Sequence, residues 1–377
     1  MKEMCNVYVS ASNVLTALGN NPEAVMKAML SGQSGIYHYD DQSIAPSPFW
    51  ASRIDMLGLP ITLSDDFTRF EKLIINSISL AARDLDTNLA SDSTLFLFST
   101  TKGNIDELPK GRRLKLHESG AFIARYFGNI QSPVIISNAC ISGTAAILAG
   151  KRLIQSGQFK NVVVAGADLV SSFVLSGFQS FKALSEGPCK PFDSERTGLS
   201  LGEGAGTMIL SAENRSNKYK DWVIAGGCLS NDANHISGPS RTGDGLQLAI
   251  EGAIADAGNK GFRKEMIGYI SAHGTATLYN DEMEAKAINT AQLQRIPLSS
   301  YKGYWGHTLG AAGLIEAAMA LESVSAGKLL PSLNYKSHGV SLPLNVLTEE
   351  TATSSRCLLK TSSGFGGCNA ALLIGKI

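Results

Sequence analysis

The chain has 377 residues, of which 44% are hydrophobic and 18% are charged, a composition typical of a folded globular protein. Its 33 basic side chains balance 33 acidic ones, so we expect no broad electrostatic binding to nucleic acid or to an anionic membrane. Six cysteines are too few for a disulfide scaffold, and no signal peptide or membrane-spanning run stands out, so we expect reduced thiols, no membrane insertion and a cytoplasmic location.

Short apolar runs alternate with longer helical patterns, which predicts an α/β fold with a mixed sheet in layers. In chain order, the predicted strands are residues 94–98, 134–137, 162–165, 207–210 and 371–374. The predicted helices are residues 71–85, 143–155, 246–257 and 309–325. The strand runs are continuous rather than alternating, as expected where both faces of a sheet are covered. Turn-forming residues cluster at 230–245, so we expect two halves, residues 1–230 and 231–377.

Two segments of the chain resemble each other weakly. Residues 136–143 open a helix rich in small side chains, and some 170 residues later residues 304–310 open another. In each, a reactive residue, Cys140 or His307, stands three positions before a glycine. This pattern favours two copies of one supersecondary unit, packed through Gly/Ala helices, although chance similarity would produce it too.

Cys140 follows a predicted strand and precedes a predicted helix. Free N–H groups at a helix N-terminus lower the pKa of a thiol there and can hold an oxyanion. The alternative is a small residue of the core, which is the more frequent role of a buried cysteine.

His273 and His307 both lie in glycine-flanked turns after strand patterns, where ligands commonly bind. Either histidine alone would suit a structural role, but with Cys140 they suggest acyl transfer through a thioester. Imidazole N–H groups can also stabilise an enolate oxygen. The run at 364–367 reads either as a glycine turn or as a mobile loop beside a substrate carbonyl, with Phe365 as a gate. The glycine-rich run at 198–206 matches no phosphate-binding fingerprint and indicates close packing instead.

With these residues the sequence resembles the β-ketoacyl synthases of the thiolase superfamily, specifically the 3-oxoacyl-acyl-carrier-protein synthase II type. The likeness covers nearly the whole chain. It rests on AC-x-SG at 139–143, KPFD-x-x-R-x-G at 190–198, GEGAG at 202–206, HGT-x-T at 273–277, Lys302 before GH-x-LGAAG at 306–313, and GFGG-x-N at 364–369.

The resemblance implies a thiolase-like fold: two pseudo-repeated halves in a five-layer αβαβα sandwich. It implies Cys140 as the acylated nucleophile, His273 and His307 as the groups that assist malonyl decarboxylation, and Lys302 with Glu284 as the pair that tunes them. Thr275 and Thr277 would contact the phosphopantetheine arm. The backbone N–H groups of Cys140 and Phe365 would form the oxyanion hole. Asp281 and Glu316 would be structural, with Glu316 at a buried cation site in some relatives.

The implied reaction is a decarboxylative Claisen condensation of an acyl thioester on Cys140 with malonyl-acyl-carrier-protein. The implied partners are acyl carrier protein and a second copy of the chain or a related subunit. No cofactor is expected, because phosphopantetheine arrives on the carrier protein. Two alternatives stay open: a non-catalytic partner subunit that sets chain length, and an acyltransferase that joins an acyl group to an alcohol or amine without decarboxylation.

Several departures from the family pattern concern the substrate. Ile141 replaces a commonly smaller residue and would narrow the acyl pocket, Ser363 replaces a second gating Phe, and Cys368 replaces a Thr. They favour a specialised polyene- or polyketide-like lipid pathway, such as that of an aryl polyene, over housekeeping fatty-acid synthesis. Because carrier protein is acidic, we expect a basic patch at the tunnel mouth. The candidates are Lys110, Arg112, Arg113 and Lys115, or Lys182 with Lys190.

Overall fold

The computed structural model describes residues 5–377, and each half of the chain builds five strands of one ten-stranded mixed sheet. The pairing of Tyr8 with Val223 joins the two five-stranded parts, called the first and second sheets below. The first sheet runs in the order β1 (Tyr8–Leu15), β8 (Gly204–Ser211), β6 (Asn161–Asp168), β4 (Thr94–Ser99), β5 (Val134–Ile136). The second runs β9 (Trp222–Asn231), β15 (Cys368–Lys376), β14 (Cys357–Gly364), β10 (Tyr269–Ser271), β11 (Leu298–Ser299). In each sheet the first two pairings are antiparallel and the last two are parallel. This identical topology confirms the expectation of two pseudo-repeated halves.

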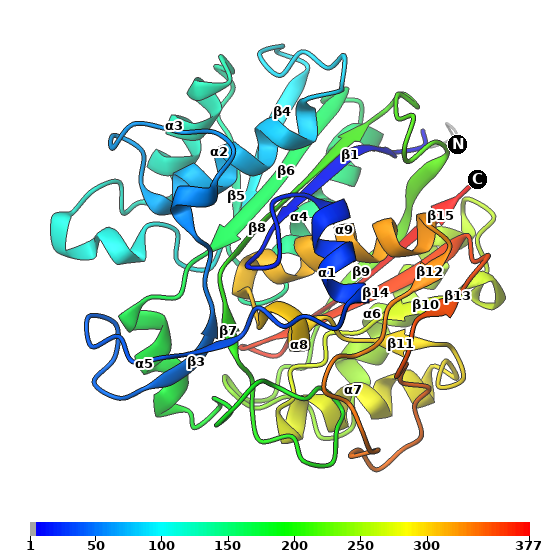
Figure 1. The fold of residues 1–377 in the computed structure, drawn as a ribbon. Helices are drawn as coiled ribbons and strands as arrows, with labels where there is room; N and C mark the ends of the chain where they lie inside the picture. The colour runs from blue at the N-terminus through cyan, green and yellow to red at the C-terminus, as the bar shows by residue number, and fades with distance from the viewer. Residues whose placement is uncertain (1–4) are drawn as a thin grey trace.

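Helices cover both sheets and fill the space between them (Figure 1). α2 (Arg69–Ala82) and α3 (Leu116–Tyr126) lie outside the first sheet, and α6 (Asp244–Gly258) and α7 (Leu278–Thr290) lie outside the second. Between the sheets, α4 (Ser142–Gln155) and α9 (Ala312–Ser325) pack on each other and contact both sheets. The predicted five-layer αβαβα sandwich is therefore confirmed.

The remaining elements connect these layers. They are α1 (Pro22–Leu30), β2 (Tyr37–Tyr39), β3 (Phe49–Ser52), α5 (Ser172–Ser180), β7 (Leu201–Gly202), α8 (Lys302–Trp305), β12 (Lys328–Leu329), β13 (Thr351–Ala352), and the short 3-10 helices η1 (Met56–Gly58), η2 (Ile105–Lys110), η3 (Lys264–Met266) and η4 (Leu309–Ala311).

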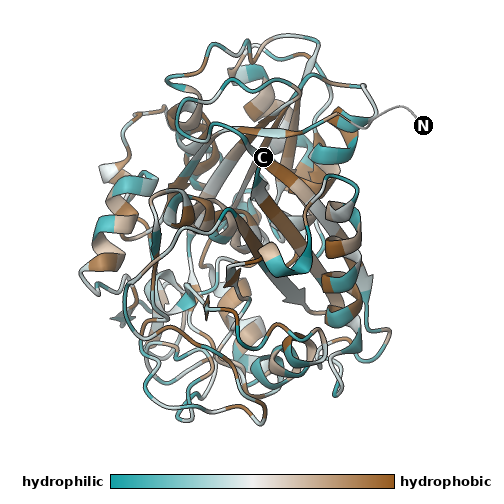
Figure 2. Ribbon diagram, turned by 90° about the vertical axis from the view of Figure 1, so that its right-hand side faces the viewer, coloured by the Kyte–Doolittle hydropathy of each residue, from teal (hydrophilic) through white to brown (hydrophobic). Residues whose placement is uncertain are grey.

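Burial explains the continuous apolar runs of the sequence. Every residue of β4, β6 and β8 is buried, and Figure 2 shows hydrophobic residues along the strands and the enclosed helices. In α9 every residue from Ala312 to Val324 is buried, so this helix is apolar on nearly all sides.

Glycine lets α4 and α9 cross with their backbones in contact. A Cβ on Gly143 would lie 2.6 Å from the backbone N of Leu314, and one on Gly313 would lie 2.9 Å from the backbone N of Thr144. Gly143 thus faces Leu314, the residue after Gly313, and Gly313 faces Thr144, the residue after Gly143. This reciprocal contact indicates a local two-fold relation between the halves. Close packing between the halves also explains the glycines of the 202–206 run, because a Cβ on Gly204 would lie 2.7 Å from Cδ1 of Ile315 in the other half.

The predicted strands and helices are present, but the structure changes the start of one helix and the expected boundary between the two halves. All five predicted strands and four predicted helices occur, although residues 309–311 form η4 rather than the first turn of α9. Strands β1, β9 and β14 were not predicted. Because β9 is the first strand of the second sheet, a boundary after residue 230 would cut it. We propose that the halves meet in the loop between Ser211 and Trp222; residues 1–4 lie outside the described part of the chain.

Candidate active site

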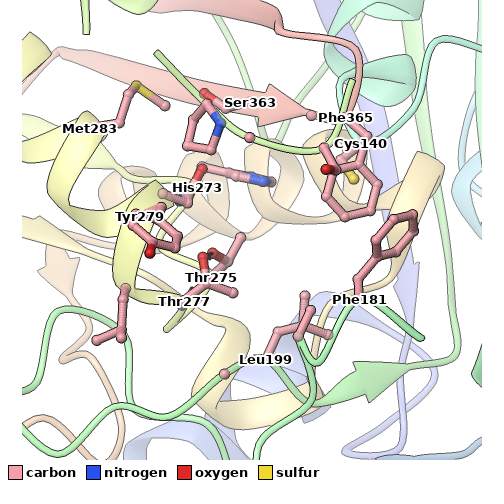
Figure 3. Close-up of a pocket in the computed structure, with 18 of the residues that line it drawn as sticks. Cys140, Phe181, Leu199, His273, Thr275, Thr277, Tyr279, Met283, Ser363 and Phe365 are labelled. Carbon is pink, nitrogen blue, oxygen red and sulfur yellow. Dashed lines mark hydrogen bonds between the residues drawn. The ribbon is translucent and has the colours of Figure 1, made fainter. Parts of the chain in front are cut away.

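A cavity of about 370 Å³ brings together residues from both halves (Figure 3). Six of the predicted site residues line it: Cys140, His273, Thr275, Thr277, His307 and Phe365. Lys302 and Glu284 are fully buried behind His273. Ile141 is also buried, but it packs on Cys368 and Ala370 instead of lining this cavity, so its influence on an acyl pocket stays a prediction.

Cys140 lies in a sharp turn between β5 and α4. The preceding residue, Ala139, has φ +43°, a left-handed conformation that aims the next residue out of the strand direction. Gly364 approaches so closely that a Cβ there would lie 2.9 Å from the backbone N of Cys140. The backbone N–H of Phe365 lies near the thiol and acts to lower its pKa. Figure 3 shows Cys140 and Phe365 together at one end of the cavity.

Burial controls the ionisation of this thiol. Loss of hydration raises the pKa of Cys140 to about 12, and the neighbouring Cys368 adds to the rise. Lys302 and the Phe365 N–H act in the opposite direction without reversing it. The prediction of a lowered pKa at the start of α4 is therefore wrong, because desolvation outweighs the helix N-terminus in a side chain that is 8% exposed.

The two histidines lie close together in the cavity and are uncharged. Their ring centroids are 5.2 Å apart at an interplanar angle of 82°. Burial, followed by the positive charge of Lys302, lowers the pKa of both His273 and His307 well below the ordinary value. At neutral pH both imidazoles are therefore neutral, each with one N–H to donate.

Lys302 determines which nitrogen of His273 carries the proton. Its ammonium lies 3.3 Å from His273 Nδ1, 2.6 Å from the His273 carbonyl oxygen and 2.5 Å from Glu316 Oε1. An ammonium group can only donate, so Nδ1 accepts and the ring proton resides on Nε2. The imidazole of His273 points into the cavity in Figure 3.

Lys302 and Glu284, the two residues expected to tune the site, have different partners, and their role in tuning it stays a prediction. Glu284 accepts from the backbone N–H groups of His273 and Gly274, both at 2.8 Å, and from Thr361 Oγ1 at 2.6 Å. It therefore fixes the backbone at the end of β10. Glu284 reaches β10 from α7 outside the second sheet, whereas Lys302 faces α9 on the inner side, where Glu316 is the nearest carboxylate.

Glu316 is bound on both sides by lysine. Its second oxygen, Oε2, lies 2.8 Å from the Nζ of Lys360, a residue that the sequence analysis missed. These two ammonium groups provide the positive charge that a buried cation would bring. Among residues 5–377 no three His, Cys, Asp or Glu side chains gather as they would to hold a metal ion. A charged residue directly after the apolar residues that begin β14 was the available signal for Lys360.

The cavity lining also contains hydroxyl and aromatic groups. The Thr275 and Thr277 hydroxyls lie 3.0 Å apart, and Asp281 accepts from the backbone N–H of Thr275 at 2.9 Å. Phe365 stacks on Phe178 at 5.6 Å and tilts against Phe181 at 5.3 Å. These aromatic neighbours, at and just after the end of α5, were not predicted, although their three-residue spacing places them on one helix face.

The two candidate basic patches differ. Lys110 and Arg112 pair with Glu107, Arg113 pairs with Glu71, and Lys115 pairs with Glu118, so the first patch is largely neutralised. In the second patch Lys190 pairs with Glu195, and Lys182 is exposed and lines the cavity. Within the described residues, no helix is both long and apolar enough to cross a membrane.

Comparison with known proteins gives the same assignment for both halves. The family model of the β-ketoacyl synthase N-terminal domain matches residues 119–216, and that of the β-ketoacyl synthase C-terminal domain matches residues 222–336. The chain is 29% identical to 3-oxoacyl-[acyl-carrier-protein] synthase 2 of Vibrio cholerae, with 98% of this chain and 99% of the relative aligned.

Solved structures agree with this family assignment over the full chain. The complex of the ketosynthase ApeO with its chain length factor ApeC from Xenorhabdus doucetiae superimposes with a TM-score of 0.88 and 28% identity, covering 100% of this chain and 99% of that one. The ishigamide ketosynthase/chain length factor superimposes with a TM-score of 0.88 and 25% identity, covering 99% of this chain and 100% of that one.

The fold and the site define a thiolase-like ketosynthase. The chain belongs to the β-ketoacyl synthase family and is a condensing acyltransferase of the 3-oxoacyl synthase type.

Proposed function

We propose that this enzyme elongates an acyl chain carried first on Cys140, using a malonyl thioester of acyl carrier protein. The observation that supports this most directly is the meeting of Cys140, His273 and His307 in one cavity, which Phe365 also lines. The relatives named as acyl-carrier-protein synthases support the carrier as donor.

In the first step the Cys140 sulfur attacks the acyl thioester carbonyl. The new S–C bond forms, the bond to the phosphopantetheine sulfur breaks, and the thiol proton leaves with that sulfur. Because the pKa of Cys140 is about 12, the proton must move as the sulfur attacks rather than beforehand. The N–H groups of Cys140 and Phe365 would hold the negative oxygen of the tetrahedral intermediate.

In the second step malonyl thioester binds and loses CO2. The electron pair of the broken C–C bond forms an enolate, whose oxygen accepts hydrogen bonds from His273 and His307. The enolate carbon then attacks the acyl carbonyl, the C–S bond to Cys140 breaks, and the sulfur takes up a proton from water, which balances the negative charge lost when the carboxylate leaves as CO2. Neutral imidazoles suit this role because the hydrogen bonds that their N–H groups donate strengthen as charge develops on the oxygen in the transition state. Thr275 and Thr277 would bind the phosphopantetheine arm.

Intact-mass measurement tests both steps. After exposure to a panel of acyl-carrier-proteins, we expect an acyl adduct on the wild type that Cys140→Ala lacks and that malonyl-carrier-protein discharges with CO2 release. Cys368→Ala is the matched control, because Cys368 is a buried neighbouring thiol outside the reaction. An adduct that persists in Cys140→Ala, or discharge without CO2, would contradict the proposal; discharge onto an alcohol or amine would indicate the acyltransferase alternative.

We also propose a specialised polyene- or polyketide-like pathway with a related partner chain. Two of the superimposed structures are ketosynthases with a chain length factor, which supports a paired arrangement over a homodimer. The aromatic lining formed by Phe178, Phe181 and Phe365 suits flat, conjugated chains. Turnover on saturated and polyunsaturated acyl-carrier-proteins of equal length tests this: a preference for saturated chains by the isolated chain would contradict it. Absence of an adduct with every donor would instead indicate the non-catalytic subunit.

A further inference from the structure

Lys360 is a fully buried ammonium group that the proposed chemistry does not use. It lies in the buried strand β14, and its side chain has no exposed surface. Burying a charged lysine is strongly unfavourable unless opposite charge and hydrogen-bond acceptors surround it. An apolar residue at this position would stabilise the fold at least as well. The contacts of Lys360 therefore point to a chemical role.

Oxygen atoms surround the Lys360 ammonium. Its Nζ lies 2.8 Å from Glu316 Oε2, 2.5 Å from the Thr361 carbonyl oxygen, 3.2 Å from that of Ser271 and 3.3 Å from that of Ala272. Ser271 ends β10, and Ala272 immediately precedes His273. The same side chain thus binds the carboxylate that holds Lys302 and the backbone that carries His273.

Lys360 also balances the charges behind the histidines. The groups that face this region are Glu316 from α9, Glu284 from α7, Lys302 from α8 and Lys360 from β14, with His273 and His307 beside them. With Lys360 the two carboxylates meet two ammonium groups. Without it, one uncompensated negative charge would remain next to the place where the enolate oxygen becomes negative.

We propose that Lys360 is a positioning residue of the decarboxylation step: by binding Glu316 and the end of β10, it holds the Lys302–His273 contact and offsets the second buried carboxylate. This inference rests on the proposed condensation but concerns only its second step. Protonation of His273 at Nδ1 would expel Lys302 from its contact, and the positive charge of Lys360 is one of the groups that oppose it.

The test separates the two steps in Lys360→Met. We expect CO2 release to fall about 10- to 100-fold, which is less than the roughly 10²- to 10⁴-fold that a positioned proton donor itself contributes, because Lys360 only holds that donor in place. Acylation of Cys140 by acyl-carrier-protein should change less than about threefold, since it does not use His273 as an enolate donor. The acidic limb of the CO2-release pH profile should move up by about one pH unit, because loss of a nearby positive charge makes His273 easier to protonate.

Lys151→Met is the matched control for losing a buried lysine. Lys151 is 3% exposed and pairs with Asp256 at 2.5 Å, away from the cavity. The Lys151→Met substitution should lower the midpoint of thermal unfolding without moving the acidic limb of the CO2-release pH profile. Should Lys360→Met fail to fold, Lys360→Gln, which keeps an N–H donor without the charge, carries the same comparison.

Equal losses in acylation and CO2 release, or an unmoved acidic limb, would overturn the role of Lys360. Failure of the wild type to release CO2 would instead contradict the proposed function, so the two failures are distinguishable. A double-mutant cycle with Glu316→Gln adds a further criterion: the two effects on CO2 release should be non-additive if Lys360 acts through Glu316.

Discussion

The turns before α4 and α9 share a residue with positive φ but differ in their chemistry. Ala139 and Leu309 both have positive φ, at +43° and +51°, and both stand four residues before the glycine at the helix crossing. A constant offset of 170 residues therefore pairs Cys140 with Gly310. The sequence analysis aligned Cys140 with His307, which is three positions too early. It aligned Gly143 with Gly310, whereas the helix crossing pairs Gly143 with Gly313.

The two turns differ in the group that contacts the residue after the positive-φ position, which is Cys140 in one turn and Gly310 in the other. The N–H of Gly310 donates to Asp168 Oδ2 at 2.7 Å, and Asp168 also accepts from Thr100 and Thr101. At the equivalent place in the first half, the glycine-rich loop at 364–367 contacts Cys140 instead. One copy of the turn is thus occupied by a carboxylate that ties the halves together, and the other is left open to a cavity. The two halves thus contain equivalent turns, and the group that contacts each turn differs: the Asp168 carboxylate in one half and the 364–367 loop beside the cavity in the other.

The largest expected effect concerns the reactivity of Cys140. Since burial raises its pKa to about 12, the rate of alkylation by iodoacetamide, followed by mass mapping of Cys140, should rise about tenfold per pH unit from about pH 7 to 10. The sign follows from the thiolate fraction, which grows tenfold per unit below the pKa. A plateau below about pH 9 would show that the start of α4 does acidify its thiol.

An intermediate effect concerns the crossing of α4 and α9. Gly143→Ala and Gly313→Ala should each lower the free energy of unfolding in urea by about 2–3 kcal/mol, because each new Cβ meets backbone of the other helix. Only Gly143→Ala should also slow acylation, since it lies in the turn of Cys140. Gly177→Ala is the control: it is a helical glycine with open space around its Cβ position, so the free energy of unfolding should hold or rise slightly. Unequal stability losses would break the two-fold comparison.

The smallest expected effect distinguishes the two basic patches. Lys182→Glu should raise KM for acyl-carrier-protein about three- to tenfold in steady-state assays, with kcat nearly unchanged, because an exposed charge at the cavity edge acts mainly on encounter. Lys110→Glu, where the ammonium already lies 3.7 Å from Glu107, is the matched control and should leave KM close to the wild-type value. The opposite result would move the carrier-binding face to the first patch.

The sequence allowed the layers and the cavity residues to be predicted, because both depend on local patterns: apolar runs, small-residue helices, and reactive residues in glycine turns. It did not allow the contacts behind the cavity to be predicted. Whether Lys302 meets Glu284 or Glu316 depends on which face of the second sheet each helix covers. The ionisation of Cys140 depends on how deeply packing buries it, and Lys360 is notable only once β14 is known to be a buried strand.

The strand order also has a consequence for how the chain folds during synthesis. In each sheet the last strand of that half, β8 or β15, lies between the first strand and the strand made just before it. The first sheet therefore cannot close until residue 211 has left the ribosome, and the second cannot close until residue 376 has left it. Such late, long-range pairing slows folding and leaves apolar strand surface exposed meanwhile. We expect nascent chains of this protein to depend on chaperones until β15 has emerged.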